Sequence, residues 1–164
     1  MKILILLRHA KTEQNRDIDD MGRHITKEGI NEIKKMGVFF KGLNIKPDFV
    51  LCSNSIRTKE TLEYFMKSSG IKPEIIYEKF VYDNNEKTII SNLSIVNKSV
   101  RKLLIVGHFP SVENMVKILA GSSIPGGKFE TSAIAVLKFD TDSWNDIMTK
   151  KGKMEIYKSP DMLN

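Results

Sequence analysis

The stretch Lys2-Ile3-Leu4-Ile5-Leu6-Leu7-Arg8-His9 decides the fold, because it is a short apolar run that stops abruptly at two basic residues. A run of leucine and isoleucine of this length is typical of a strand buried on both faces of a sheet. It is too short for a membrane-spanning helix, which needs about 20 apolar residues, and it lacks the small-residue cleavage site of a signal peptide. We therefore expect a soluble protein of the cytoplasm.

Beyond this strand, short apolar runs alternate with segments of helical periodicity. Thr26 is placed to cap a helix whose apolar residues recur at helical spacing until Gly42. Further helices are expected over residues 55–67, over residues 86–96 and between Pro110 and Gly121, whereas residues 144–148 fit either a short helix or a loop. The other expected strands span residues 49–52, 74–77, 103–106, 133–139 and 154–157.

This alternation predicts an α/β fold class, a three-layer α/β/α sandwich around a mostly parallel central sheet. The last two strands are expected to pair and to add an antiparallel edge strand. Residues 71–101 must supply a strand, a helix and their connections, so we expect no large cap insertion. Neither a linker nor a repeat interrupts the chain, which predicts a single domain over residues 1–164.

The composition excludes several classes of function. Apolar residues are 41% and charged residues 28% of the 164 residues, as in ordinary globular proteins, and the net charge of +6 comes from scattered lysines. Because no compact basic run is present, we expect neither a nucleic-acid nor a membrane partner; a lysine-rich solvated surface or an anionic partner explains the charge. The single Cys52 excludes an intramolecular disulfide framework and reads as a buried strand residue.

The histidines give no sign of a metal site. His9, His24 and His108 lack the spacing of metal ligands, so neither a metal nor another cofactor is expected. His24 lies in a polar loop and is expected to be exposed. We also expect the chain to act as a monomer.

Polar residues directly follow three of the expected strands: Arg8-His9, Ser53 to Arg57, and Gly107-His108. In α/β sheets ligands bind at the carboxyl ends of the strands, so these residues are expected to meet. Arginine presents a planar fork of donors to phosphate oxygens, and histidine is a nucleophile toward phosphorus. Arg8, Arg57 and a protonated His108 would suit the outer oxygens of a phosphoryl group. Taken singly, each histidine also fits a structural hydrogen bond, and Arg57 a surface ion pair.

Several segments in the right order carry a family pattern. The first is Leu7-Arg8-His9-Ala10-Lys11-Thr12, and the others are residues 23–29, 52–61, 106–113, 131–135 and 158–160. In the same order, these six segments are similar to six motifs of one protein family: a signature loop, R-x-L-T-x-x-G, S-x-x-x-R-(A/T)-x-x-T, G-H-N-P-x-x-E, T-(S/G)-A-(I/L)-A and a C-terminal x-x-P. The chain thus resembles the histidine phosphatase superfamily, also called phosphoglycerate mutase-like, in its phosphohistidine phosphatase branch of the SixA type. Ala10 replaces the family's usual glycine, a change that this branch tolerates.

The resemblance implies a phosphatase whose nucleophile is His9. The remaining site residues that it implies are the phosphoryl clamp, Arg8 and Arg57, and His108, which completes the pocket. Thr131 and Ser132 would bind substrate through a backbone or hydroxyl donor, or would only begin a strand. The expected partner is a phosphorylated protein or a small phosphate-bearing substrate.

A leaving-group acid is the part of the family pattern that this chain lacks. Relatives that act on alkyl phosphates use an acidic residue. The candidates here are Glu78, Asp83 and Glu86, none of which fits the family's acid motif convincingly, and Glu13 in the first loop is a further candidate. An imidazole leaves phosphorus with less help than an alkoxide, because the ring is protonated near neutral pH. An open pocket without a clear acid therefore favours phosphohistidine on proteins. A small-molecule phosphomonoesterase and a non-catalytic phosphate- or phosphoprotein-binding module are the alternatives.

Overall fold

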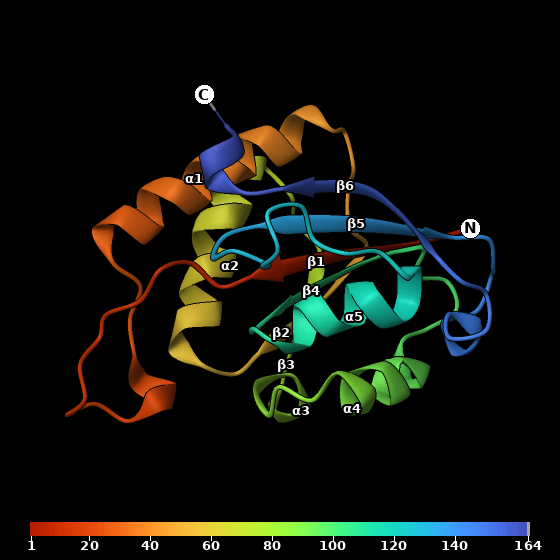
Figure 1. Ribbon diagram of the computed structural model, residues 1–164, viewed down its shortest axis with the longest axis horizontal. Coiled ribbons are helices and arrows are strands. Elements are labelled where there is room, and N and C mark those ends of the chain that lie inside the picture. Colours follow the sequence, from red (N-terminus) through yellow and green to blue (C-terminus); the bar gives the residue numbers. More distant parts are fainter. Residues whose placement is uncertain (164) are drawn as a thin grey trace.

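The computed structural model describes residues 1–163, and its centre is a six-stranded sheet with strand order β3-β2-β4-β1-β5-β6 (Figure 1). The strands are β1 (Lys2–Arg8), β2 (Phe49–Ser53), β3 (Glu74–Glu78), β4 (Lys102–Gly107), β5 (Ile134–Phe139) and β6 (Lys153–Lys158). The first four strands pair in parallel, β5 runs antiparallel to β1, and β6 runs antiparallel to β5. Antiparallel pairing at this edge is confirmed, but the reversed strand is β5, one position in from edge strand β6.

Helices cover both faces of the sheet, as the sandwich prediction requires. They are α1 (Lys27–Gly42) and α2 (Ile56–Ser69) on one face, and α3 (Lys79–Tyr82), α4 (Glu86–Ser91) and α5 (Ser111–Ala120) on the other (Figure 1). Short 3-10 turns are η1 (Asp20–Gly22), η2 (Asn92–Ile95), η3 (Trp144–Asp146) and η4 (Pro160–Met162). The ambiguous segment 144–148 therefore begins as a 3-10 turn.

The helix expected over residues 86–96 is shorter than predicted. It ends at Ser91 and continues as the 3-10 turn η2. The side chains of Ser91 and Asn92 both donate to the Thr88 carbonyl, at 3.0 and 2.8 Å, and Ser94 donates to Ser91. Such local side-chain bonds compete with the regular helical ladder. Helix α3 was not predicted, because four residues are too few to show a helical period.

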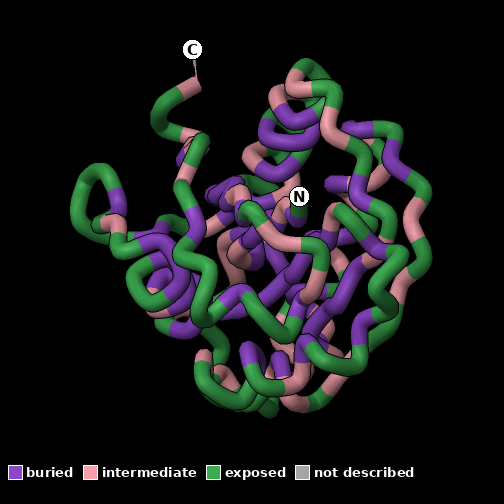
Figure 2. The backbone as a smooth tube through the Cα atoms, turned by 90° about the vertical axis from the view of Figure 1, so that its right-hand side faces the viewer, coloured by how far each residue is buried: buried purple, intermediate pink, exposed green. Residues whose placement is uncertain are grey.

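Strand β1 lies inside the sheet and forms the core of both layers. Leu4 and Leu6 pack toward α4 and α5, whereas Ile5 and Leu7 pack toward α1 and α2, and all four are fully buried. This explains why the sequence shows a continuous apolar run instead of alternation. Buried backbone, purple in Figure 2, accordingly runs through the middle of the molecule, with exposed loops around it.

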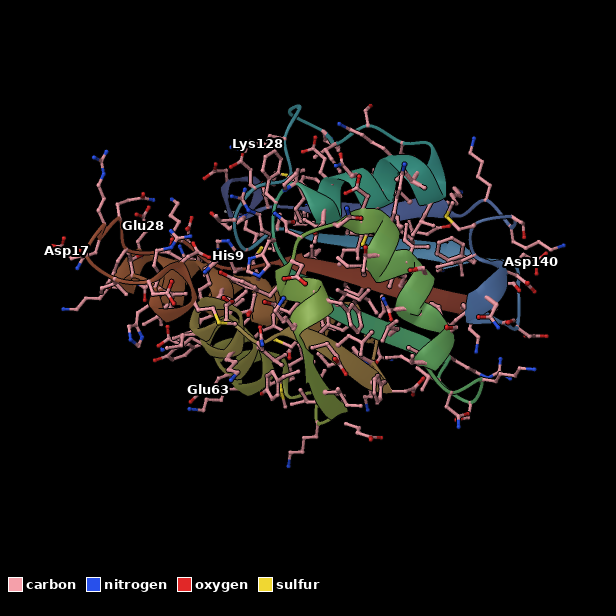
Figure 3. All side chains as sticks on the ribbon, turned by 90° about the horizontal axis from the view of Figure 1, so that it is seen from below. His9, Asp17, Glu28, Glu63, Lys128 and Asp140 are labelled. Carbon is pink, nitrogen blue, oxygen red and sulfur yellow. The ribbon has the colours of Figure 1, made fainter. Side chains whose placement is uncertain are left out.

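The register of the parallel strands brings their carboxyl ends to one edge. Arg8 pairs with Gly107, and Cys52 pairs with Val106, so the residues that follow β1, β2 and β4 emerge side by side. Figure 3 places His9 at this edge and Asp140 at the opposite end of the sheet. Residues 79–95 instead pack on the face of the sheet through Val81, Ile89 and Leu93, which confirms that no large cap insertion covers the edge.

The helix caps hold the loops around this edge in place. The Thr26 hydroxyl accepts a hydrogen bond from the Gly29 amide at 3.0 Å and begins α1 as expected. At the start of α2, the Ser55 hydroxyl accepts from the Thr58 amide. Each cap satisfies a helix-terminal N–H that would otherwise lack a partner.

Helices α1 and α2 approach closely at Gly37, and this contact is testable. A Cβ at Gly37 would collide with the Ser68 hydroxyl and lie 3.1 Å from the Phe65 carbonyl oxygen, whereas a Cβ at Gly42 would meet nothing within 4 Å. We expect Gly37→Ala to lower the free energy of unfolding by about 1–3 kcal/mol through overpacking. Gly42→Ala is the matched control and should leave it unchanged or raise it by up to about 1 kcal/mol. Urea unfolding measures both, and equal effects would contradict the contact.

Candidate active site

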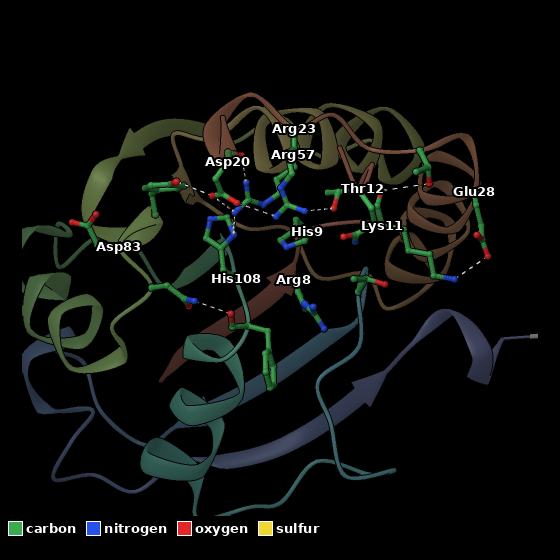
Figure 4. A pocket seen from close by; sticks show the side chains of 16 residues that line it. Arg8, His9, Lys11, Thr12, Asp20, Arg23, Glu28, Arg57, Asp83 and His108 are labelled. Atoms are coloured by element: carbon green, nitrogen blue, oxygen red, sulfur yellow. Dashed lines mark hydrogen bonds and ion pairs between the residues drawn. The ribbon is translucent and has the colours of Figure 1, made fainter. Parts of the chain in front are cut away.

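A pocket of about 810 Å³ lies at the carboxyl ends of β1, β2 and β4 (Figure 4). Its walls come from the loop after β1, the start of α2, the end of α3 and the turn after β4. Five of the predicted site residues line it: Arg8, His9, Arg57, His108 and Thr131. The structure therefore brings together residues that are far apart in the sequence, as the strand-end argument predicted.

His9 is held as a neutral ring with one free nitrogen. Its Nδ1 lies 2.8 Å from the Ala10 carbonyl oxygen. Because a carbonyl oxygen only accepts, Nδ1 carries the proton and Nε2 keeps its lone pair. Burial lowers the pKa of His9 to about 3; the Ala10 hydrogen bond opposes this shift, while His108 and Arg57 add to it. Such a ring is a nitrogen nucleophile at neutral pH.

His108 is fixed in the opposite tautomer. Arg57 Nη2 lies 3.3 Å from its Nδ1, and a guanidinium only donates, so this nitrogen accepts. Its Nε2 then donates to the Ser53 hydroxyl oxygen at 2.7 Å. Burial, followed by the charge of Arg57, lowers the pKa of His108 to about 3. The expectation of a protonated His108 is thus wrong for the free pocket, because a buried ring beside an arginine stays neutral.

Arg8 is anchored by the loop between α5 and β5. Its Nη1 donates to the Phe129 carbonyl oxygen at 2.7 Å, and its guanidinium lies 5.2 Å from the centre of the Phe109 ring. The buried Glu113 carboxylate accepts from the Phe129 amide at 2.8 Å and so holds that carbonyl in place. The Nε of Arg8 is buried and finds no partner among the described residues.

Arg57 lies at the start of α2 and is only 5% exposed. Its Nη1 donates to the Asp20 carbonyl oxygen at 2.7 Å, and its Nη2 contacts Asp20 Oδ2 at 3.1 Å. Like Arg8 Nε, Arg57 Nε is buried without a partner in residues 1–163. Arg23, which also lines the pocket, has a buried Nε without a partner in the same residues. Three guanidinium groups around one pocket favour an anion as its ligand.

Thr131 and Ser132 differ in position. Thr131 lines the pocket, whereas Ser132 lies behind it with a positive φ of 60°. The Ser132 amide donates to the carbonyl oxygens of Arg8 and His9 at 3.2 and 3.1 Å. Ser132 therefore supports the backbone of the two site residues from the side of β5.

Of the four candidate acids, only Asp83 lines the pocket, and it pairs with Lys79 at 3.0 Å. Sequence reasoning missed Asp20, whose carboxylate accepts from Tyr82 at 2.7 Å and contacts Arg23 at 3.1 Å. Nothing in the local sequence marks Asp20, since its partners Arg57 and Tyr82 come from distant elements. Glu13, Glu78 and Glu86 lie outside the lining.

Two other predictions concern groups outside the pocket. His24 is exposed, as expected, and its Nδ1 lies 3.0 Å from Glu60 Oε2. Cys52 is buried in β2, and burial raises the pKa of its thiol to about 12, which confirms a structural role. Within residues 1–163, no group of three or more His, Cys, Asp or Glu side chains is arranged to hold a metal ion. Over the same residues, no helix combines the length and the apolar character needed to cross a membrane.

Comparison with known sequences identifies the family. A model described as the histidine phosphatase superfamily, branch 1, matches residues 4–79, which include β1, His9 and Arg57. The chain belongs to the histidine phosphatase superfamily. An uncharacterized protein of Mycobacterium tuberculosis is 31% identical over 149 residues, covering 86% of this chain and 91% of that protein. Membership in the histidine phosphatase superfamily confirms the predicted class of enzyme, a phosphatase.

Two solved structures share this histidine phosphatase fold. A candidate phosphohistidine phosphatase SixA from Nakamurella multipartitia has a TM-score of 0.85 at 24% identity, covering 97% of this chain and 96% of the other. The protein histidine phosphatase SixA complexed with tungstate has a TM-score of 0.84 at 23% identity, covering 99% of both chains. The predicted SixA-type fold is therefore confirmed.

The three histidines of this histidine phosphatase should titrate differently. We expect His24 to titrate above its usual pKa of 6.5, because its hydrogen bond to Glu60 favours the charged ring. His9 and His108 should stay neutral down to about pH 4, with protons on Nδ1 and Nε2 respectively. ¹⁵N NMR of the imidazoles across pH measures both properties.

The same shifts set the sign of a stability effect. Because the pKa values of His9 and His108 are about 3 in the folded chain and 6.5 is the ordinary value, the unfolded chain binds more protons between them. The free energy of unfolding should therefore fall as pH drops through this window. A His9 ring that titrates near its ordinary value would contradict the assigned environment.

Proposed function

We propose that this chain removes phosphoryl groups from phosphohistidine on proteins, through a phosphorylated His9. The observation that carries the proposal is the tautomer of His9, whose Nε2 lone pair is free because the Ala10 carbonyl holds the proton on Nδ1. Arg8 and Arg57 line the same pocket and supply the positive charge for the phosphoryl oxygens. A structure of SixA, which shares this fold, is of a complex with tungstate, an oxyanion, and this supports anion binding by the fold.

In the first step, His9 Nε2 attacks phosphorus in line with the substrate nitrogen. The new P–N bond forms as the old one breaks, and the leaving nitrogen keeps the electron pair. A substrate ring already protonated on its other nitrogen leaves as neutral imidazole. Arg8 and Arg57 hold the outer oxygens, while His108 supports Arg57 by accepting from its Nη2.

In the second step, water attacks phosphorus and the bond to His9 Nε2 breaks. The leaving phosphate carries the oxygen and both protons of that water, and His9 regains its lone pair as a neutral ring, ready for another cycle. The Ala10 carbonyl keeps the Nδ1 proton in place throughout, which lets the phosphorylated ring carry the positive charge that makes it a good leaving group.

The acids near the pocket support phosphohistidine over an alkyl phosphate. An alkoxide needs a proton as it leaves. Burial by itself would raise the pKa of Asp20, but the hydrogen bond from Tyr82 and the charge of Arg57 outweigh burial and lower this pKa. Asp20 is thus ionised and a poor proton donor at neutral pH. The two other acids that line the pocket, Asp83 and Glu28, are paired with Lys79 and Lys11 respectively.

His9→Ala tests the covalent intermediate. We expect kcat/KM to fall on the order of a thousandfold or more, and the acid-labile phosphate that labels the wild-type enzyme to be absent. His24→Ala is the matched control, because it removes an exposed histidine outside the pocket, and should keep labelling and turnover. Rapid quench with radiolabelled substrate measures both. Labelling that survives in His9→Ala would contradict the mechanism. Absence of labelling in the wild-type enzyme would also contradict it, and would favour a phosphate-binding module without catalysis.

Substrate preference tests the leaving group. A histidine-phosphorylated protein should be turned over with higher kcat/KM than any member of a panel of phosphate monoesters. The alternative function, a small-molecule phosphomonoesterase, is supported by the presence of Asp83 in the pocket as a candidate acid. If an ester were preferred, and if Asp83→Asn slowed only that ester, the enzyme would be a small-molecule phosphomonoesterase.

A further inference from the structure

Asp20 joins three parts of the chain at the rim of the pocket. It belongs to the turn η1, and it contacts Arg23 nearby, Arg57 at the start of α2, and Tyr82 at the end of α3 (Figure 4). Its side chain is 51% exposed, so these contacts are reached from the open side of the pocket. Asp20 Oδ2 accepts hydrogen bonds from Arg57 and Tyr82, while Oδ1 forms an ion pair with Arg23.

The contact with Arg57 occupies the donors that a phosphoryl group needs. Both terminal nitrogens of Arg57 donate to Asp20, one to the carbonyl oxygen at 2.7 Å and the other to the carboxylate at 3.1 Å. A guanidinium binds carboxylate and phosphate through the same planar fork. The Asp20 carboxylate therefore takes Nη2 as a phosphate oxygen would, while Nη1 is held by a neutral main-chain carbonyl.

The carboxylate is also held in its charged form. Hydrogen bonds and charges from Tyr82, Arg57 and Arg23 lower the pKa of Asp20 against the opposing effect of burial. An incoming phosphate dianion thus meets a fixed negative charge beside one of its two clamps, and like charges at this range repel.

We propose that Asp20 competes with phosphate for Arg57, and so weakens the binding of the product and speeds its release. A protein-borne phosphoryl group offsets this repulsion through its other contacts with the enzyme, whereas free phosphate has none. Asp20 is then a residue that tunes the pocket for turnover. The inference rests on the proposed function only in that the pocket takes a phosphoryl group.

The test is direct binding of inorganic phosphate to the full chain, measured by isothermal titration calorimetry. Asp20→Asn keeps the size of the side chain and an oxygen acceptor but removes the charge. We expect the Kd for phosphate to fall about five- to tenfold. A gain of affinity is informative, because a loosened or partly unfolded site would lose affinity.

Asp83→Asn is the matched control. It makes the same change of charge on a residue that lines the same pocket but pairs with Lys79 and contacts neither site arginine. We expect it to change the Kd by less than about twofold, because the competition is local to Arg57. An equal gain in both variants would assign the effect to general charge and overturn the competition.

Two further outcomes decide the inference. Unchanged or weaker phosphate binding in Asp20→Asn would show that Asp20 only positions Arg57, and would overturn it. If that variant does not fold, Asp20→Ser removes the same charge and should show the same gain. Since no substrate is used, absence of a phosphorylated enzyme would defeat the proposed function without touching this result.

Discussion

The backbone pairing at the end of β1 is the constraint on which the rest of the site depends. Arg8 pairs with Gly107 on one side, the His9 amide donates to the Gly107 carbonyl, and the Ser132 amide binds both site carbonyls from the other side. A one-residue slip of this strand would break these bonds and turn the side chains at its end to the opposite face of the sheet. The same bonds that set the core therefore set the direction of the two functional side chains.

Around this fixed point, the pocket separates charge from nucleophilicity. The arginines carry the positive charge, and burial beside them keeps both histidines neutral. A neutral ring has the lone pair that attack on phosphorus requires, whereas the arginines supply the charge that the phosphoryl oxygens require. The opposite tautomers of His9 and His108 follow from two ordinary partners, a carbonyl that only accepts and a guanidinium that only donates.

The features that the sequence predicted correctly are those written in local patterns or in topology. The strand ends, the Thr26 cap and the meeting of Arg8, His9, Arg57 and His108 follow from periodicity and from parallel pairing. Asp20 and Tyr82 could not be found in this way, because their contact joins a loop to a helix 62 residues away. The charge of His108 was predicted wrongly because burial, which sequence does not show, outweighs the ordinary pKa of the ring. Where family motifs were present they located the residues, but not their protonation.

The burial of Cys52 has a consequence for the chemistry of stress. Phosphatases that attack through a thiolate lose activity when an oxidant converts that sulfur to a sulfenic acid. This chain has a single cysteine, and its thiol is buried in β2, where burial raises its pKa to about 12, and does not line the pocket. Peroxide therefore finds no cysteine thiolate among the residues that line the pocket, and the dephosphorylation that we propose for His9 would continue under oxidising conditions that inactivate cysteine-dependent phosphatases.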